Sequence, residues 1–218
     1  MSSHIIKYEF SLVKRTDYAI TVTNKLLSLP LIEKADLFAE AGLAKIKYPI
    51  KDYKGAIEDF TKAIEIYPKE PYYYRYRSWA KKSLGDLDGM LSDQNKEIEL
   101  APLNPDSYIR RAYTKSKLND LSGAISDYSI AIELEPEDSY NYNYRADIRR
   151  KQGDFAGAIS DYTKIIELNE IARTGYYMRG KVKHQIGDTS YCKDWKAAAE
   201  LGNVNAAKLF ETHCSNLL

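Results

Sequence analysis

The sequence predicts an all-α protein: an α-solenoid, a right-handed superhelix of about five helix-turn-helix repeats with capping helices at both ends. Three observations favour this fold class. Residues of one kind recur every 34 positions, apolar residues within each period have helical spacing, and turn residues divide each period into two helices. With 44% hydrophobic and 29% charged residues, the chain has the composition of a folded protein.

The 34-residue step appears in several independent series. It joins the members of the following sets: Pro68, Pro102 and Pro136; Asp59, Asp93, Asp127 and Asp161; Ile57, Leu91, Ile125 and Ile159; Gly85, Asn119, Gly153 and Gly187. Because so many series agree, we infer that one supersecondary unit is repeated along the chain.

Each period contains two helices in a fixed order. Small residues recur on the first helix, where paired helix axes must approach closely: Ala44, Ser78, Ala112, Ala146 and Gly180. Gly or Asn ends this helix, because either residue tolerates the left-handed conformation of a turn. On the second helix, Ala124, Tyr128 and Ala131 are three or four residues apart and therefore share one face. Pro136 stops it, since the residue before a proline is driven out of the α region.

These features resemble the tetratricopeptide repeat. The resemblance rests on the small residue of the first helix, on the turn Gly153-Asp154-Phe155, on Ala158, Ile159, Asp161 and Tyr162, and on the closing segment Glu133 to Pro136. It covers residues 37–202 as five units: 37–70, 71–104, 105–138, 139–172 and 173–202. Two rows of basic residues depart from the family pattern: Arg77, Arg111, Arg145 and Arg179, and Lys47, Lys81, Lys115, Arg149 and Lys183.

The second unit and the two ends of the chain are atypical. Met90, Gln94 and Glu97 stand where the third unit has Ala, Tyr and Ala, so we expect looser packing there. Residues 1–36 form an N-terminal segment, in which we expect a capping helix over 17–29 and a loosely ordered start before about residue 10. Residues 203–218 should contain a C-terminal capping helix over 203–214, with Asn203 as its N-cap.

The arginine row is expected to be structural. Each arginine follows an aspartate of the preceding unit by 18 residues, in the pairs Asp59 and Arg77, Asp93 and Arg111, Asp127 and Arg145, and Asp161 and Arg179. A guanidinium binds a carboxylate through two parallel hydrogen bonds, so these pairs are predicted to join neighbouring units. Five tyrosines are expected to pack between helices: Tyr73, Tyr74, Tyr108, Tyr142 and Tyr176.

The resemblance implies that the first helices line a concave face, and helical phase indicates which side chains point into it. The candidate peptide-binding residues are Tyr72, Arg75, Tyr76 and Trp79; Ile109, Arg110, Tyr113 and Lys117; Tyr140, Asn143, Tyr144, Asp147 and Arg150; and Tyr177, Met178, Lys181 and His184. Tyr and Arg are favoured at recognition surfaces, because they give large contact areas with few rotors to freeze. This aromatic and basic row predicts a protein or peptide partner with acidic and apolar or aromatic groups.

The predicted function is a non-catalytic scaffold or adaptor that binds a peptide segment of a partner protein. The first alternative is a structural subunit that associates with itself. The second is single-stranded RNA binding on the same face, because bases stack on Tyr and Trp. Chaperone C-terminal tails are not supported, since no three successive units supply the Lys and Asn residues that the family uses for them; units two to four offer Arg75, Trp79, Arg110, Tyr140 and Tyr144.

No catalytic, cofactor or metal site is predicted. Gly175 to Lys181 has the spacing of a phosphate loop, but Val182 replaces the required Ser or Thr and no strand precedes it. Cys192 and Cys214 lack metal-site spacing, and free, partly buried thiols are expected. A net charge of +1 argues against a general nucleic-acid surface. Without a secretory signal or a membrane span, a cytoplasmic location is expected.

Overall fold

The computed structural model describes residues 28–47, 49–168 and 171–214, and within them it contains eleven α-helices and no strand. The predicted all-α class is therefore confirmed. The helices belong to two compact units, Met1–Gly85 and Asp86–Leu218. The boundary falls inside the second predicted repeat, the one with the atypical Met90, Gln94 and Glu97. The expected loosely ordered start and nearly all of the expected helix over 17–29 lie outside the described residues.

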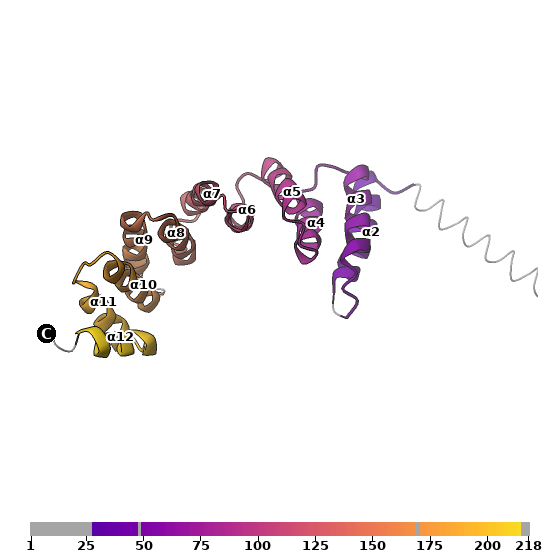
Figure 1. Ribbon diagram of the computed structural model, residues 1–218. Helices are drawn as coiled ribbons and strands as arrows, with labels where there is room; N and C mark the ends of the chain where they lie inside the picture. The colour runs from indigo at the N-terminus through magenta and orange to yellow at the C-terminus, as the bar shows by residue number, and fades with distance from the viewer. Residues whose placement is uncertain (1–27, 48, 169–170, 215–218) are drawn as a thin grey trace, which may run out of the picture. The chain divides into compact units, whose positions relative to one another are not determined.

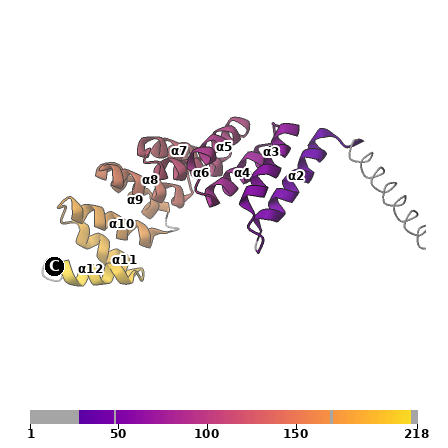
Figure 2. The ribbon, with the colours of Figure 1, turned by 45° about the vertical axis from the view of Figure 1, so that its right-hand side comes forward.

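The first unit contains α2 (Leu31–Ile46), α3 (Tyr53–Ile66) and α4 (Pro71–Ser83), which Figure 2 shows in sequence order. Helix α3 packs against both α2 and α4. The core between them includes Ala39, Ala56, Phe60 and Tyr73, each at most 1% exposed. Small and aromatic side chains thus alternate across the helix contacts, which brings the helix axes close together.

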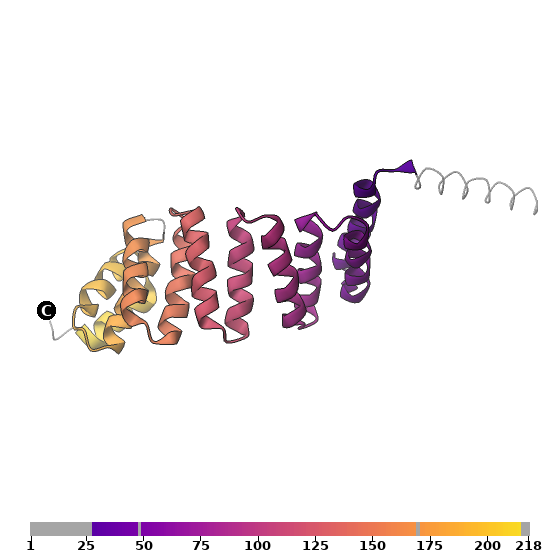
Figure 3. The ribbon, with the colours of Figure 1, turned by 90° about the horizontal axis from the view of Figure 1, so that it is seen from above.

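The second unit contains α5 (Leu87–Leu100), α6 (Pro105–Lys117), α7 (Leu121–Leu134), α8 (Ser139–Gln152), α9 (Phe155–Leu168), α10 (Ala172–Gln185), α11 (Tyr191–Glu200) and α12 (Val204–Cys214). From α5 to α12, each helix packs against its neighbours in sequence (Figures 1 and 3). Packing between sequence neighbours defines a helical repeat solenoid. Its right-handed twist stays a prediction.

The turn chemistry follows the sequence prediction, and it adds a cap. Gly153 and Asn119 end their first helices with φ of 88° and 64°, the left-handed conformation that these residues tolerate. Each second helix from α3 to α9 then starts with an Asp carboxylate that accepts a hydrogen bond from a glycine N–H three residues later, at 2.9 Å: Asp52 from Gly55, Asp86 from Gly89, Asp120 from Gly123 and Asp154 from Gly157. At the C-terminal end, the predicted N-cap is confirmed, because the Asn203 Oδ1 accepts from Ala206 N–H at 3.0 Å.

One predicted small residue lies in the wrong place. Ala44 is exposed, whereas Gly42 is buried, and a Cβ on Gly42 would lie 3.0 Å from the ring of Phe60. Gly42 precedes Phe60 by 18 residues, but Ala112 precedes Tyr128 by 16, so the first repeat has two extra residues between these contact positions. This insertion shifts the contact register of α2 by two residues.

The other small residues are buried as predicted: Ser78, Ala112, Ala146 and Gly180 on first helices, and Ala56, Ala124 and Ala158 on second helices. Gly180 has no room for a side chain, because a Cβ there would lie 2.6 Å from the indole of Trp195. Trp195 is itself only 1% exposed and has little space to move.

Gly180→Ala should lower the free energy of unfolding by about 1–3 kcal/mol, the usual cost of overpacking a core, although Ala is the better helix former. Chemical denaturation followed by circular dichroism measures this, with Gln185→Ala on the exposed side of α10 as the matched control. A stabilised Gly180→Ala protein would contradict the packing seen between α10 and α11.

The expectation of free thiols is wrong. Cys192 in α11 and Cys214 at the end of α12 form a disulfide, with their Cα atoms 5.7 Å apart and a sequence separation of 22. The spacing gives no sign of this pair, because only the fold of α12 back onto α11 brings the two cysteines together.

Candidate functional site

The arginine row is structural, but its predicted pairing is wrong. Arg111, Arg145 and Arg179 each bind the aspartate of their own repeat rather than that of the preceding one. Arg145 donates from Nε and Nη2 to Asp161 at 3.1 and 2.7 Å, and Arg111 binds Asp127 in the same way at 2.8 and 2.7 Å. The two helices of a hairpin are antiparallel, so a residue on the first helix faces one about 16 positions later on the second.

The arginines also reach the preceding repeat, through a hydroxyl or amide group instead of a carboxylate. Nη1 of each arginine donates to a polar oxygen 16 residues earlier, at 2.9 to 3.1 Å: Arg77 to Thr61, Arg111 to Asn95, Arg145 to Ser129 and Arg179 to Thr163. Each guanidinium also lies over a tyrosine ring three residues earlier, 5.5 to 5.7 Å from its centroid. One side chain therefore links two repeats.

A second basic residue completes each of these sites. Lys115, Arg149 and Lys183 contact the same aspartates as Arg111, Arg145 and Arg179, at 2.9 Å. In the first unit Lys45, rather than Lys47, contacts Asp59 at 2.7 Å, which is the two-residue shift of α2 again. The hydrogen bond to Asp59 raises the pKa of Lys45, and that to Asp127 raises the pKa of Arg111. Lys45, Lys115, Arg149 and Lys183 are thus paired within the protein and are not spare ligand-binding cations.

In the second unit, the candidate binding residues lie on α6, α8 and α10, most of them at positions related by the 34-residue step. We call this surface the first-helix face; it consists of Ile109, Arg110, Tyr113, Lys117, Tyr140, Asn143, Tyr144, Asp147, Arg150, Tyr177, Met178, Lys181 and His184. Tyr113, Tyr140 and Tyr144 are 40 to 48% exposed, so their rings are accessible from solvent. By contrast, Tyr108 and Tyr142 on the same helices are 8% exposed and donate to proline carbonyls, so their predicted packing between helices is confirmed.

Two exposed lysines give the first-helix face its positive charge. Lys117 lies 5.4 Å from the ring centroid of Tyr113, and Lys181 lies 5.5 Å from that of Tyr177. Neither lysine contacts a carboxylate within the described part of the chain, unlike the paired cations of the two basic rows. Both ammonium groups can therefore bind an incoming anion without breaking an ion pair.

Two other candidate residues, Tyr144 and Asp147, already have partners within the protein. Tyr144 stacks on Tyr128, with ring centroids 5.7 Å apart. Burial raises the pKa of Tyr128 to about 12. Asp147 accepts a hydrogen bond from the hydroxyl of Tyr162 at 2.8 Å, and burial together with this carboxylate raises the pKa of Tyr162 further. Tyr144 and Asp147 thus shape the surface, and the more accessible groups are Tyr113, Tyr140 and the two lysines.

Arg110 differs from the prediction most clearly, because it turns inward to a buried carboxylate. Its Nη2 donates to Glu97 at 2.7 Å, and Ser107 donates to the same oxygen at 2.9 Å. Glu97 is fully buried. In the next repeat the corresponding residues are Ala131, Asn141 and Tyr144, so this polar cluster occurs at one interface and not at its neighbour. The sequence signal that could have revealed this cluster is the joint presence of Glu97 and Arg110 where the next repeat has Ala131 and Tyr144.

In the first unit, the candidate residues of α4 form an aromatic cluster. Tyr76 stacks on Phe60 at 6.0 Å and meets Tyr72 edge-on at 4.8 Å, with Trp79 at 6.4 Å. Trp79 is 47% exposed at the edge of this cluster. The Tyr73 hydroxyl donates to Asp36, which fixes α4 against α2. The cluster offers an exposed aromatic surface beside Arg75, whose side chain is half-buried.

The apparent phosphate-loop spacing has a packing explanation. Gly175 and Gly180 lie inside α10, where a Cβ would meet Ile166 at 2.9 Å and Trp195 at 2.6 Å, respectively. Within residues 28–47, 49–168 and 171–214, no three His, Cys, Asp or Glu side chains gather in a metal-binding arrangement. Among the described helices, none has both the length and the apolar content needed to cross a bilayer.

Comparisons with known proteins agree with this geometry. The family model for the tetratricopeptide repeat matches residues 41–70 and 105–138. The crystal structure of the MamA protein superposes with a TM-score of 0.69 at 19% identity, over 77% of this chain and 91% of that one. YrrB, described as a TPR protein with an unusual peptide-binding site, gives 0.66 at 15% identity, over 89% of this chain and 97% of that one.

A third structure is that of the first TPR of Spaghetti (RPAP3), bound to the HSP90 peptide SRMEEVD. Its TM-score is 0.52 at 27% identity, over 56% of this chain and 95% of that one. No curated protein matches the chain in sequence. Two segments of the chain therefore match the tetratricopeptide-repeat model, and the described helices share the fold of the solved TPR protein YrrB. Tetratricopeptide repeats are generally non-catalytic interaction modules.

Proposed function

We propose that this protein is a non-catalytic adaptor whose first-helix face binds an extended, acidic segment of a partner protein. The observation that carries the proposal is the pair of exposed lysines, Lys117 and Lys181, each lying against a tyrosine and neither committed to a carboxylate of the described chain. A carboxylate side chain of the partner would find a cation and an aromatic ring at each of these two places.

The exposed tyrosines supply the apolar part of the proposed contact. Tyr113 and Tyr140 present ring surface together with a hydroxyl that hydrogen-bonds to a peptide backbone. Such residues commonly carry most of the binding energy at interfaces. Acidic residues interleaved with apolar or aromatic ones therefore match this face better than a purely acidic tail. The aromatic surface of α4 in the first unit, with Trp79, is a second place for an apolar side chain.

Chaperone tails are not part of the proposal, although the RPAP3 domain was solved with such a peptide. Arg110, which stands in the candidate carboxylate-binding position of the third repeat, is bound to Glu97. With the two-residue shift of α2, Ala39 and Leu43 correspond to Arg75 and Trp79 of the second repeat, so the first repeat offers no cation there either. A cytoplasmic site of action completes the proposal.

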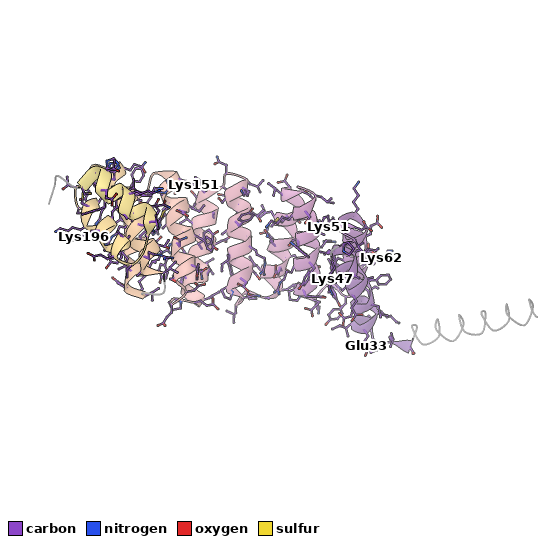
Figure 4. The ribbon with its side chains drawn as sticks, turned by 90° about the horizontal axis from the view of Figure 1, so that it is seen from below. Glu33, Lys47, Lys51, Lys62, Lys151 and Lys196 are labelled. Carbon is purple, nitrogen blue, oxygen red and sulfur yellow. A yellow bond between two sulfur atoms is a disulfide. The ribbon has the colours of Figure 1, made fainter. Side chains whose placement is uncertain are left out.

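Binding to a synthetic peptide pair tests this function. We expect a twelve-residue peptide of alternating Glu and Phe to bind the full chain at least tenfold more tightly than its Lys and Phe counterpart, measured by fluorescence anisotropy. Lys117→Glu with Lys181→Glu should remove at least 90% of this preference, because each site then repels the ligand. The matched control is Lys193→Glu with Lys196→Glu on α11, an equal charge change at exposed positions (Lys196, Figure 4).

Two outcomes would contradict the proposal. One is unchanged binding in the Lys117→Glu, Lys181→Glu protein, and the other is equal loss in the α11 control. Binding of an oligouridine instead, with a steep dependence on salt, would favour the RNA alternative. Light scattering over a concentration range separates a self-associating subunit from a monomeric adaptor.

A further inference from the structure

The C-terminal helix α12 has a very small buried contact with the rest of the protein. Ala206 and Cys214 are its buried residues, while Leu209 and Phe210 pack at the edge of the same cluster. The outer side of α12 is exposed and carries Val204, Asn205, Lys208, Glu211 and Thr212. One of the two residues that anchor α12 is therefore a cysteine in a disulfide.

Helix α12 covers an apolar surface of α11 that would be exposed to water in its absence. Trp195, Ala198 and Cys192 of α11 are at most 5% exposed. On the outer edge, the ring of His213 of α12 lies tilted against that of His184 of α10, with ring centroids 5.0 Å apart, and 5.8 Å from the ring of Trp195. Removal of α12 would expose this indole, and Trp195 is one of only two tryptophans in the chain.

We propose that Cys192 and Cys214 are a reversible redox site that latches α12 onto α11. A dithiol reductant opens the latch by thiol–disulfide exchange: one thiolate attacks a sulfur of the pair, and the other cysteine leaves as a thiolate. The second thiol of the reductant then resolves the mixed disulfide. The protein gains two electrons and two protons, and the reductant becomes a disulfide. The redox chemistry does not depend on peptide binding, although His213 of α12 contacts His184 of the first-helix face.

Loop closure gives the size of the expected effect. The disulfide closes a loop with a sequence separation of 22 residues. Loss of such a cross-link should raise the frequency with which α12 opens from α11 by roughly a hundredfold. Both sulfurs are buried, so the reductant reaches them only when α12 opens. In a reducing compartment the dithiol form prevails, and oxidation there would form the disulfide and hold α12 on α11.

Hydrogen exchange on the full chain tests the latch, in the oxidised form and after treatment with dithiothreitol. We expect the amides of 204–214 to exchange at least tenfold faster in the reduced protein, with those of α6 to α9 unchanged. In a Trp79→Phe background, acrylamide should quench Trp195 more strongly after reduction. Cys214→Ser should behave like the reduced protein under both conditions.

Three results would overturn the proposal. The first is equal exchange of α12 in the two redox forms. The second is faster exchange throughout α6 to α9 after reduction, which would make the disulfide a general staple instead of a local latch. The third is failure of the reduced protein to reform the disulfide with oxidised glutathione, shown by an intact mass that stays that of the dithiol.

Discussion

Arg145→Ala should lower the free energy of unfolding by about 3–5 kcal/mol, since it leaves a buried carboxylate without its main partner. Asp161 is 2% exposed and would keep a single hydrogen bond from Arg149 at 2.9 Å. Arg145 also loses its bond to Ser129 and its contact with Tyr142. For a chain of this length, the melting temperature should fall by roughly 10 °C, measured by calorimetry.

The control for this variant is Lys151→Ala, on the exposed C-terminal end of the same helix (Figure 4). A surface change of this kind usually alters stability by less than about 0.5 kcal/mol. Equal melting temperatures for the two variants would refute a structural role for the arginine row. A double-mutant cycle separates the two pairings: coupling should be large between Arg145 and Asp161 and small between Arg145 and Asp127.

Arg110→Ala should also cost about 3–5 kcal/mol, because it removes a charged partner of the buried Glu97 carboxylate. Copying the next repeat should remove this cost. In the double variant Glu97→Ala with Arg110→Tyr, the interface between α5 and α6 has the Ala and Tyr of that repeat and lacks the Glu97–Arg110 ion pair. Replacing a buried ion pair with apolar residues of similar volume is often neutral or stabilising.

Urea denaturation of the two variants measures this difference. Recovery to within about 1 kcal/mol of the parent protein would show that the Glu97 and Arg110 pair is replaceable for folding. A double variant as unstable as Arg110→Ala would contradict the proposed equivalence of the two interfaces. Peptide binding measured on the recovered protein then tests whether Arg110 contributes to the first-helix face at all.

The sequence was sufficient wherever the signal was periodic. The small residues, the left-handed Gly or Asn and the apolar positions repeat every 34 residues, and a repeat unit must present the same contacts to each neighbour. For this reason the helix pairs, the buried tyrosines Tyr108 and Tyr142 and the C-terminal cap at Asn203 were predicted correctly. The same period also indicated the exposed tyrosines, since helical phase separates the two faces of each first helix.

A periodic signal does not specify which of two neighbouring repeats supplies a partner. Arg145 has an aspartate 18 residues before it and another 16 residues after it, and both recur with the period. Only the antiparallel packing of α8 on α9 selects Asp161. The 34-residue period did not reveal the two-residue shift of α2, because an insertion in one repeat changes the register of a single helix and does not recur.

The sequence by itself therefore determined the architecture and the residue types available on each helix face. Tertiary structure alone decided which charges are neutralised within the protein, as for Arg110, and which stay available, as for Lys117 and Lys181. It alone paired Cys192 with Cys214, because that contact depends on how α12 folds back and not on any spacing. Local pattern sets the helices, while the neutralisation of charge and the pairing of cysteines depend on distances between helices, which a linear sequence does not contain.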